Sequence, residues 1–399
     1  MNILMLSATF PYPPSKGGTQ VRTFNLLAYL QRNHAITLAV QVSPQVKPKH
    51  IAALQNYVAD LKVFEAAPAP SLQAIAKLQR LGQSWRTGIP PNVASRAQPD
   101  MQAWLDAQVE SGRFDVLTCE HSVNEIFVRP QWRDRLPTVV NIHSSVAATC
   151  AQQLQAGTAE HPWRDRLNLS LLQRYERSYC RKFKHLVVTT PEDAQQFQTF
   201  APNTPITVIP NGVDLELFPM RPRDPGGQTL IFAGAMDNQP NIDAAQFLAL
   251  RILPRLQQRY PQLALRLVGA RPVPAVQALA QQAGVTVTGR VDSMVQELHQ
   301  ATVCVIPMRS GFGIKNKTLE ALAAGIPVVG SDRALEGLNL DGQMVLRANA
   351  IEEYEQAIGQ LLDNPSLRQQ FSTAGRQFIE QHYTWDVAGQ RYEAVLANG

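Results

Sequence analysis

Residues 303–331 read VCVIPMRSGFGIKNKTLEALAAGIPVVGS, two apolar runs that flank a glycine-bearing loop and a helical segment. The first run ends at Pro307, and the second begins just after Gly325 closes the helical segment. A buried strand, a loop, a helix and another buried strand are typical of a parallel sheet that is covered by helices. This stretch therefore predicts an α/β fold.

The same alternation of short apolar runs and amphipathic segments continues along the whole chain of 399 residues. One series of predicted strands runs from Asn2–Ser7 to Ile206–Ile209, and a second runs from Leu230–Phe232 to Pro327–Val329. A chain of this length usually forms two or three domains. The pattern therefore predicts two open α/β sheets, one in each half of the chain.

The boundary between the two series lies in a stretch rich in proline and glycine, LFPMRPRDPGG, which regular structure does not tolerate. We predict an N-terminal domain at residues 1–215, a linker at 216–227 and a C-terminal domain at 228–383. The tail from Pro365 onward is expected to be wholly helical, because its apolar residues recur near the helical period. Its last part, about 384–399, is expected to pack back on the first domain.

Several classes of protein are excluded by what the sequence lacks. It has no run of 18 apolar residues and no basic leader followed by an apolar stretch, which argues against a membrane span and a secretory signal. The four cysteines match no metal or redox spacing. No Asp-x-Asp triplet, phosphate-binding G-x-x-x-x-G-K-[ST] loop or G-x-S-x-G turn occurs. We therefore expect a cytoplasmic protein without metal, cofactor or nucleic-acid partner.

The loop and helix in 303–331 form a candidate anion site. Gly311 and Gly313 allow backbone N–H groups to approach an anion, and Lys315 and Lys317 supply two positive charges at the start of a helix. Glu320 follows one turn later and can accept hydrogen bonds from a ribose diol. The alternative for Glu320 is a carboxylate that merely stabilises the start of its helix.

Two further positions in the first half have the chemistry of a ligand site. Gly17 and Gly18 directly precede a helix, where backbone amides can bind a phosphate or a sugar hydroxyl, although a flexible turn is the alternative. His143 directly follows a buried strand, which is where open α/β sheets bind ligands. A structural histidine is the alternative there.

Together these segments resemble the family 4 glycosyltransferases of GT-B fold, and the resemblance extends over nearly the whole chain. The most specific segments are IPNGVD at residues 209–214 and KTLEALAAGIPVV at 317–329. Others are LIFAGAMDNQPNIDAA at 230–245 and VTVTGRVDSM at 285–294. Within the family, the chain is most similar to bacterial transferases of exopolysaccharide and cell-surface sugar assembly.

The resemblance implies two Rossmann-like parallel-sheet domains that face each other across a cleft, with a nucleotide-sugar such as a UDP-sugar as donor and a glycan or lipid-linked acceptor. It implies a retaining, metal-independent sugar transfer. The catalytic residues implied by it are His143, Lys317 and Glu320. The residues implied to bind the donor or its phosphates are Gly17, Gly18, Gly311, Phe312, Gly313, Lys315, Lys317, Glu320 and, with weaker support, Arg290.

One position departs from the family pattern. The first acid of the family's E-x7-E motif is replaced by Phe312. This replacement motivates one alternative, a catalytically silent protein that binds nucleotide-sugars. A second alternative is a sugar-nucleotide epimerase of the same two-domain architecture.

The charge distribution and one helical segment raise the question of a membrane partner. Residues 1–200 carry 21 Lys and Arg against 14 Asp and Glu, whereas residues 201–399 carry 16 against 18. Between Trp163 and Lys184, aromatic and leucine residues recur every four positions among seven basic residues. This segment is either a core-facing helix or a basic amphipathic helix that contacts an anionic membrane at the inner face.

Overall fold

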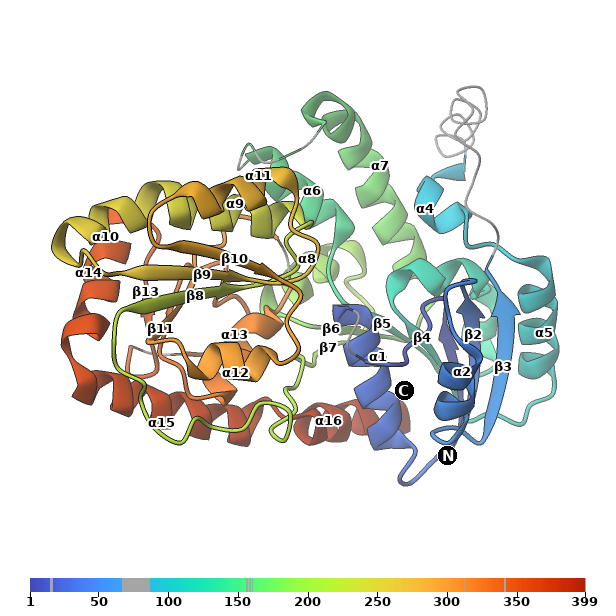
Figure 1. Ribbon diagram of the computed structural model, residues 1–399. Coiled ribbons are helices and arrows are strands. Elements are labelled where there is room, and N and C mark those ends of the chain that lie inside the picture. Colours follow the sequence, from blue (N-terminus) through green and yellow to red (C-terminus); the bar gives the residue numbers. More distant parts are fainter. Residues whose placement is uncertain are drawn as a thin grey trace. The chain divides into compact units, whose positions relative to one another are not determined.

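The computed structural model describes residues 1–14, 17–66, 87–155, 157, 159, 161–311, 313–340 and 342–398. The chain divides into two compact units (Figure 1). Unit 1 comprises Met1–Ala151, His161–Pro210 and Ala388–Gly399, and unit 2 comprises Gln152–Glu160 and Asn211–Val387. The boundaries predicted at 1–215 and 228–383 stay a prediction.

Unit 1 contains a parallel sheet with the strand order β3-β2-β1-β4-β5-β6-β7 in the described part of the chain. The strand order reverses between β1 and β4. These two strands are neighbours in the sheet, and Ile3 of β1 is paired with Val116 of β4. Its strands are β1 (Asn2–Ser7), β2 (Ala35–Val42), β3 (Asp60–Glu65), β4 (Val116–Glu120), β5 (Thr138–Ile142), β6 (His185–Val188) and β7 (Ile206–Val208).

Helices join the strands of unit 1, and the start of α8 (Pro191–Phe200) shows why a helix forms there. Thr190 accepts a hydrogen bond from the Asp193 N–H, and Pro191 occupies the first helical position, where its missing N–H costs nothing. The helices are α1 (Gly18–Leu30), α2 (Pro48–Gln55), α4 (Pro91–Ala94), α5 (Pro99–Glu110), η1 (Ser122–Phe127), η2 (Pro130–Asp134), α6 (Val146–Gln155), α7 (Pro162–Cys180) and α8 (Pro191–Phe200).

Unit 2 repeats the same plan with the strand order β10-β9-β8-β11-β12-β13 in its described residues. The strand order here reverses between β8 and β11. Its strands are β8 (Thr229–Ala233), β9 (Ala264–Val268), β10 (Val285–Gly289), β11 (Val303–Ile306), β12 (Val328–Gly330) and β13 (Val345–Arg347). Its helices are α9 (Gln239–Phe247), η3 (Leu248–Ile252), α10 (Leu253–Arg259), α11 (Pro274–Gln277), η4 (Ala278–Gln281), α12 (Met294–His299), α13 (Asn316–Ala323), α14 (Ile351–Asp363) and α15 (Pro365–His382).

The central strands are buried on both faces, as a parallel sheet covered by helices requires. Ile3, Leu4, Met5 and Leu6 of β1 are fully buried, so successive side chains on opposite faces are all removed from water. The α/β prediction is confirmed. The sequence analysis did not predict two of the strands. One is β3, an edge strand in which only Phe64 is buried, and the other is β13, which has three residues. Both lack the continuous apolar run that marks a central strand.

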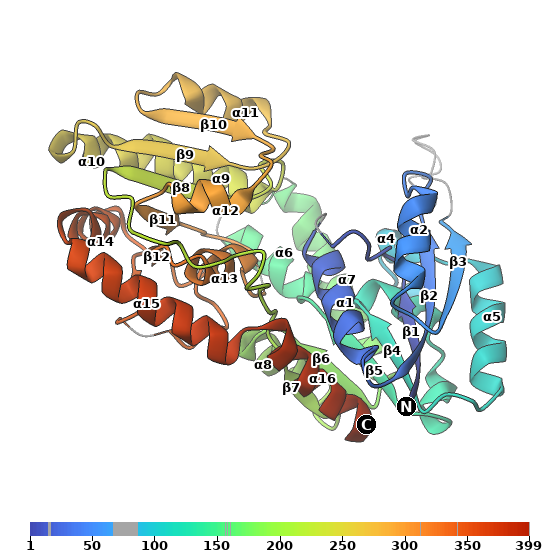
Figure 2. The same ribbon diagram turned by 60° about the horizontal axis from the view of Figure 1, so that its bottom comes forward.

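The C-terminal tail is two helices rather than one. α15 ends at His382, and the backbone of Tyr383 (φ −131°, ψ 35°) leaves the helical region before α16 (Trp385–Asn398) begins. Residues 388–399 belong to unit 1, where α16 lies beside α1 (Figure 2). Glu393 accepts hydrogen bonds from the Tyr29 hydroxyl at 3.4 Å and bonds the His34 imidazole at 2.7 Å.

Gly389 sets how closely α16 approaches α1. A Cβ atom on Gly389 would lie 2.2 Å from Cγ of Tyr29, inside its van der Waals radius. We expect Gly389→Ala to lower the free energy of unfolding by about 1–3 kcal/mol, because overpacking outweighs the higher helix propensity of alanine. Chemical denaturation of the parent and the variant measures this change in the free energy of unfolding. Gly342→Ala is the control, since no described atom lies within 4 Å of a Cβ there. A stabilised Gly389→Ala variant would contradict this packing.

Candidate active site

The candidate anion site of unit 2 lies where the strand order reverses. β8 and β11 are neighbours in the sheet, and α13 follows the loop after β11. In open α/β sheets, ligands bind outside the carboxyl ends of the strands at this switch point. Lys317 and Glu320 both lie on α13, three residues apart, and therefore share one side of the helix.

Lys317 is held in a largely apolar environment. Its Nζ donates to Oδ1 of Asn241 at 2.6 Å, contacts Sδ of Met308 at 3.8 Å and lies 4.4 Å from the ring centre of Phe232. A Cβ on Gly234 would lie 2.9 Å from Nζ, so the glycine leaves the space that the ammonium occupies. Burial lowers the pKa of Lys317 to about 7, because an ammonium loses its hydration there.

Glu320 is the complementary half of this cluster. Burial raises the pKa of its carboxyl to about 7, and the charge of Lys317 opposes that rise. Among the described residues no side chain donates a hydrogen bond to the Glu320 carboxylate. The carboxylate is therefore available to hydroxyl donors. The Glu320 side chain is half-buried by exposed area, and its role as a ribose ligand or as a helix-start carboxylate stays a prediction.

Lys315 differs from Lys317 in its partners. Its side chain is buried at the start of α13, where Nζ donates to the carbonyl of Gly313 and lies 3.4 Å from Oε2 of Glu336. Gly311 (φ 101°) and Gly313 (φ 74°) have left-handed backbones that favour glycine. Phe312 lies outside the described residues. The geometry thus makes Lys315 a support for the loop and Lys317 the better-placed cation.

Arg290 stands apart from this cluster in the sheet. It follows β10, and β9 separates β10 from β8. Its side chain is exposed, and within the described chain it makes no ion pair. The structure therefore brings Lys317 and Glu320 together and leaves Arg290 two strands away.

In unit 1, the paired glycines begin α1 directly after the loop that follows β1. The Gly17 backbone is extended, and its carbonyl accepts a hydrogen bond from the Val21 N–H at 3.0 Å. Among the described atoms, a Cβ on Gly18 would meet nothing within 4 Å, and one on Gly17 would meet Oε1 of Gln20 at 3.5 Å. The packing of unit 1 does not require either glycine, and their role in binding a ligand stays a prediction.

His143 follows β5, and its ring packs at a tilt of 60° against a second histidine that sequence reasoning missed. The rings of His143 and His121 have centres 4.9 Å apart. His121 follows β4 with φ 77°, and its Nδ1 accepts from the Val123 N–H, so the proton of a neutral ring is on Nε2. Nε2 of His143 is buried and has no hydrogen-bond partner among the described residues.

Both histidines are held neutral. Burial, and secondarily the charge of Arg96, lowers the pKa of His121 to about 4. Burial likewise holds the pKa of His143 well below its usual range, with further contributions from His121 and Arg22. His143 is therefore a neutral hydrogen-bonding group near pH 7 and not a cation.

A buried polar network lies beside this pair. Nε of Arg22, on α1, donates to Oδ1 of Asn141 at 2.9 Å, and Nδ2 of Asn141 donates to Oε2 of Glu120 at 2.9 Å. The hydroxyl of Tyr392, on α16, donates to the other oxygen of Glu120 at 2.5 Å. Burial lowers the pKa of Arg22 to about 10 and raises that of Glu120. The network joins α1, β4, β5 and α16.

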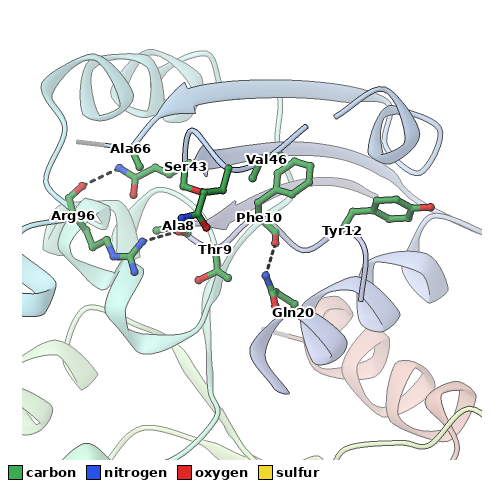
Figure 3. Close-up of a pocket in the computed structure, with 11 residues that line it drawn as sticks. Ala8, Thr9, Phe10, Tyr12, Gln20, Ser43, Val46, Ala66 and Arg96 are labelled. Atoms are coloured by element: carbon green, nitrogen blue, oxygen red, sulfur yellow. Dashed lines mark hydrogen bonds between the residues drawn. The ribbon is translucent and has the colours of Figure 1, made fainter. Parts of the chain in front are cut away.

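A cavity of about 220 Å³ lies at the carboxyl ends of β1, β2 and β3, within unit 1 (Figure 3). Gln41 is 2 % exposed, its Nε2 donates to the carbonyl of Arg96, and its buried Oε1 has no partner among the described residues. Arg96 donates to the carbonyl of Ala8 at 3.0 Å. The cavity is lined by Ala8, Thr9, Phe10, Tyr12, Gln20, Gln41, Ser43, Gln45, Val46, Ala66 and Arg96.

This lining suits a hydroxyl-rich ligand. It combines amides, hydroxyls and one guanidinium with the ring of Tyr12, and it contains no carboxylate. Sequence reasoning missed the cavity because Arg96 is far from β1 in the chain and no motif connects them. Asn241, His121 and Arg22 were missed for the same reason.

Two absences apply to the described residues alone. No cluster of three His, Cys, Asp or Glu side chains there is placed to hold a metal ion. No helix in that part of the chain is long and apolar enough to cross a membrane.

Two family models match the chain, one for each half. A model described as Glycosyltransferase Family 4 matches residues 16–217, just over half of the chain, and one described as Glycosyl transferases group 1 matches residues 227–364. Similar proteins include a phosphatidyl-myo-inositol mannosyltransferase of Mycobacterium leprae, 25% identical over 96% of this chain and 94% of the relative. A GDP-mannose-dependent mannosyltransferase of Corynebacterium glutamicum that acts on a monoacylated phosphatidylinositol monomannoside is 27% identical, over 47% of this chain and 55% of the relative.

Solved structures show the same fold over the full length. The sucrose-phosphate synthase of Thermosynechococcus elongatus has a TM-score of 0.70 at 17% identity, and each chain is covered completely. The Anabaena protein HepE in complex with UDP has a TM-score of 0.68 at 13% identity, again with complete coverage. The predicted GT-B architecture of two Rossmann-like sheets is confirmed.

The lowered pKa of Lys317 predicts proton uptake when a nucleoside diphosphate binds. A neighbouring anion restores the charged form, so the pKa rises from about 7 toward the usual 10.5, and protons are taken up between these pH values. At pH 8 roughly nine-tenths of Lys317 is neutral, so uptake approaches about 0.9 proton per site. Calorimetric titration with UDP or GDP, repeated in buffers of different ionisation enthalpy, counts these protons.

The Lys317→Met variant is expected to lose this uptake, and Glu320→Gln is expected to retain it. Near pH 8 the Glu320 carboxyl is already mostly ionised, because its pKa is about 7. Nucleotide binding by the parent protein without any dependence on the buffer would contradict the assignment of Lys317 to the phosphate site.

Proposed function

The chain belongs to glycosyltransferase family 4, and we propose that it transfers a sugar from a nucleotide-sugar donor to a glycan or lipid-linked acceptor, with retention of configuration and without a metal. The observation that carries the proposal is the Lys317 and Glu320 pair at the switch point of unit 2. The pair offers a desolvated cation for a diphosphate and an unoccupied carboxylate for a ribose diol.

In this proposal Lys317 acts mainly on the leaving group. The bond between sugar and diphosphate breaks, and negative charge grows on the phosphate oxygens. A cation in an apolar environment stabilises that charge far more strongly than one in water. The amides at the start of α13 would add fixed dipoles, and Lys315 would hold the preceding residues in place. The diphosphate itself would accept the proton of the acceptor hydroxyl, since retention is proposed to follow a front-side path.

Unit 1 is proposed to hold the acceptor and the reacting sugar. His143, neutral at physiological pH, would hydrogen-bond a sugar hydroxyl through its free Nε2. The cavity beside β1 would take the acceptor hydroxyls on Oε1 of Gln41 and the donors of Thr9 and Arg96. The names of the similar mannosyltransferases suggest the first substrates to test: GDP-mannose as donor and phosphatidylinositol as acceptor. A panel of UDP-sugars with glycan acceptors is the second set.

The transfer is tested by incubating the protein with each donor and acceptor and analysing the products by mass spectrometry and NMR. A new glycoside with the anomeric configuration of the donor is expected, with unchanged yield in the presence of a chelator. Lys317→Met should lower kcat by about 10² to 10³ and raise the donor KM, because its charge matters most in the transition state.

The control for this variant is Arg223→Gln, which removes an exposed cation elsewhere in unit 2 and should leave both constants unchanged. An epimerised donor would show the alternative enzyme class, and the absence of any product would show a silent binding protein. Chelator-sensitive activity would refute metal independence. An unchanged kcat for Lys317→Met would show that the diphosphate does not bind at Lys317.

The acceptor cavity is tested separately with Arg96→Gln and Thr9→Val. Loss of a hydrogen bond to a charged group costs about 1.5–3 kcal/mol, so Arg96→Gln should raise the acceptor KM by about 10- to 100-fold. Thr9→Val should raise the acceptor KM by a smaller factor, because the Thr9 hydroxyl is neutral. The donor KM and UDP or GDP affinity should stay the same. If both variants instead raised the donor KM and left the acceptor KM unchanged, the cavity would not be the acceptor site.

A further inference from the structure

The apolar residues of helix α7 are buried at one end of the helix and exposed at the other. At the C-terminal end, Tyr175 and Tyr179 are buried in the core of unit 1. At the N-terminal end, the Trp163 side chain is 80 % exposed and that of Leu167 is 64 % exposed. The two exposed residues are four apart and therefore neighbours on one side of the helix. Figure 1 shows α7 extending away from the strands of its unit.

The exposed side of α7 continues with positive charge. Arg164, Arg166, Arg174 and Arg177 are all exposed, whereas Asp165 is half-buried and Glu176 is buried, so the helix has no exposed acid. At 3.6 residues per turn, Arg174 and Arg177 fall on the same side as Trp163 and Leu167. Of the four arginines, only Arg164 has a carboxylate partner among the described residues, namely Asp165 at 3.1 Å.

Three arginines without a carboxylate partner among the described residues share one side of α7 with an exposed tryptophan and leucine, and one of them, Arg177, also lies 5.6 Å from the ring centre of Phe200. This combination matches the chemistry of a lipid interface. Tryptophan favours the boundary between headgroups and acyl chains, and arginine binds anionic headgroups. A protein partner would need acidic side chains at matching positions to neutralise Arg166, Arg174 and Arg177. An anionic bilayer needs no such match, because its headgroups move laterally to the arginines. The guanidinium of Arg166 lies 5.9 Å from the ring centre of Trp163, so apolar and cationic groups are already adjacent.

We infer that the exposed side of α7, formed by Trp163, Leu167, Arg166, Arg174 and Arg177, docks unit 1 on an anionic membrane surface, with the first two side chains inserted among the lipids. This docking surface is separate from the cavity and from the residues proposed to bind the donor. The inference does not require the proposed sugar transfer, because binding to vesicles is measured without donor or acceptor. Docking would place a lipid-linked acceptor on the same surface as the enzyme.

The test is flotation of the full-length protein with vesicles of phosphatidylcholine alone or mixed with phosphatidylglycerol, at low and high salt. Binding is expected only to the mixed vesicles, and it should weaken as salt screens the arginines. Trp163→Ser combined with Leu167→Ser should lower the partition coefficient at least about tenfold. Arg174→Gln combined with Arg177→Gln should lower it by about 10- to 30-fold, since each cation near such a surface contributes about fivefold.

Matched controls come from unit 2. Leu217, 62 % exposed, is replaced by Ser, and the exposed Arg223 and Arg251 are both replaced by Gln; these variants should bind vesicles like the parent. Tryptophan fluorescence gives a second measurement. The chain has five tryptophans, of which Trp132 and Trp385 are buried and Trp104 is half-buried, so comparison with a Trp163→Phe variant isolates the signal of Trp163. Mixed vesicles should shift the emission to shorter wavelength in the parent. Trp163→Phe should still bind without that shift.

Three results would overturn the inference. Equal binding to neutral and mixed vesicles would remove the role of charge. Unchanged binding by both α7 double variants would place the contact elsewhere. A change of oligomeric state in Trp163→Ser with Leu167→Ser, measured by analytical ultracentrifugation without lipid, would show that this surface contacts another protein copy. Circular dichroism and thermal unfolding confirm that each variant is folded.

Discussion

The hydrogen bonds of the buried Glu120 carboxylate are the interactions on which the packing of α1 and α16 in unit 1 depends. The carboxylate lies at the end of β4, fully removed from water, and its two oxygens accept hydrogen bonds from Tyr392 and Asn141. Removing one partner of such a group leaves a buried polar atom unsatisfied, which is far more costly than the bond itself. Because Tyr392 is on α16 and Asn141 holds Arg22 on α1, this one carboxylate fixes the last helix of the chain against the first.

Each unit places a desolvated cation near the switch point of its sheet. In unit 1 it is Arg22, whose pKa is lowered to about 10, and in unit 2 it is Lys317, whose pKa is lowered to about 7. Part of this difference is the higher ordinary pKa of a guanidinium, 12.5 against 10.5 for an ammonium, and the rest follows from the partners. Arg22 is bonded to Asn141 and lies near Glu120, whereas Lys317 has one amide oxygen, a thioether and an aromatic ring. Arg22 therefore serves the structure, and Lys317 remains able to respond to an anion.

The division of α7 shows how one helix can serve two environments. Tyr175 and Tyr179 belong to the core, while Trp163 and Leu167 are in water. Burial of the tyrosines anchors the helix, so the exposed end is held in a fixed orientation without being buried itself. The sequence left open a core-facing helix or a basic amphipathic helix that contacts a membrane. The structure buries the C-terminal part of these nineteen residues and exposes the N-terminal part, and the membrane contact stays a prediction.

The sequence by itself determined the two α/β sheets, the family, and the loop and helix from Gly311 to Glu320, because these depend on local periodicity and on residues adjacent in the chain. It predicted Lys315 and Lys317 as two cations of one phosphate site and favoured Lys317. Only the tertiary structure shows their different partners, since Glu336 and Asn241 reach them from distant segments. The partners of His143, the cavity at Arg96 and the exposure of Trp163 were likewise decided by tertiary structure. Desolvation and hydrogen bonding depend on neighbours in space, and spacing along a single chain does not record them.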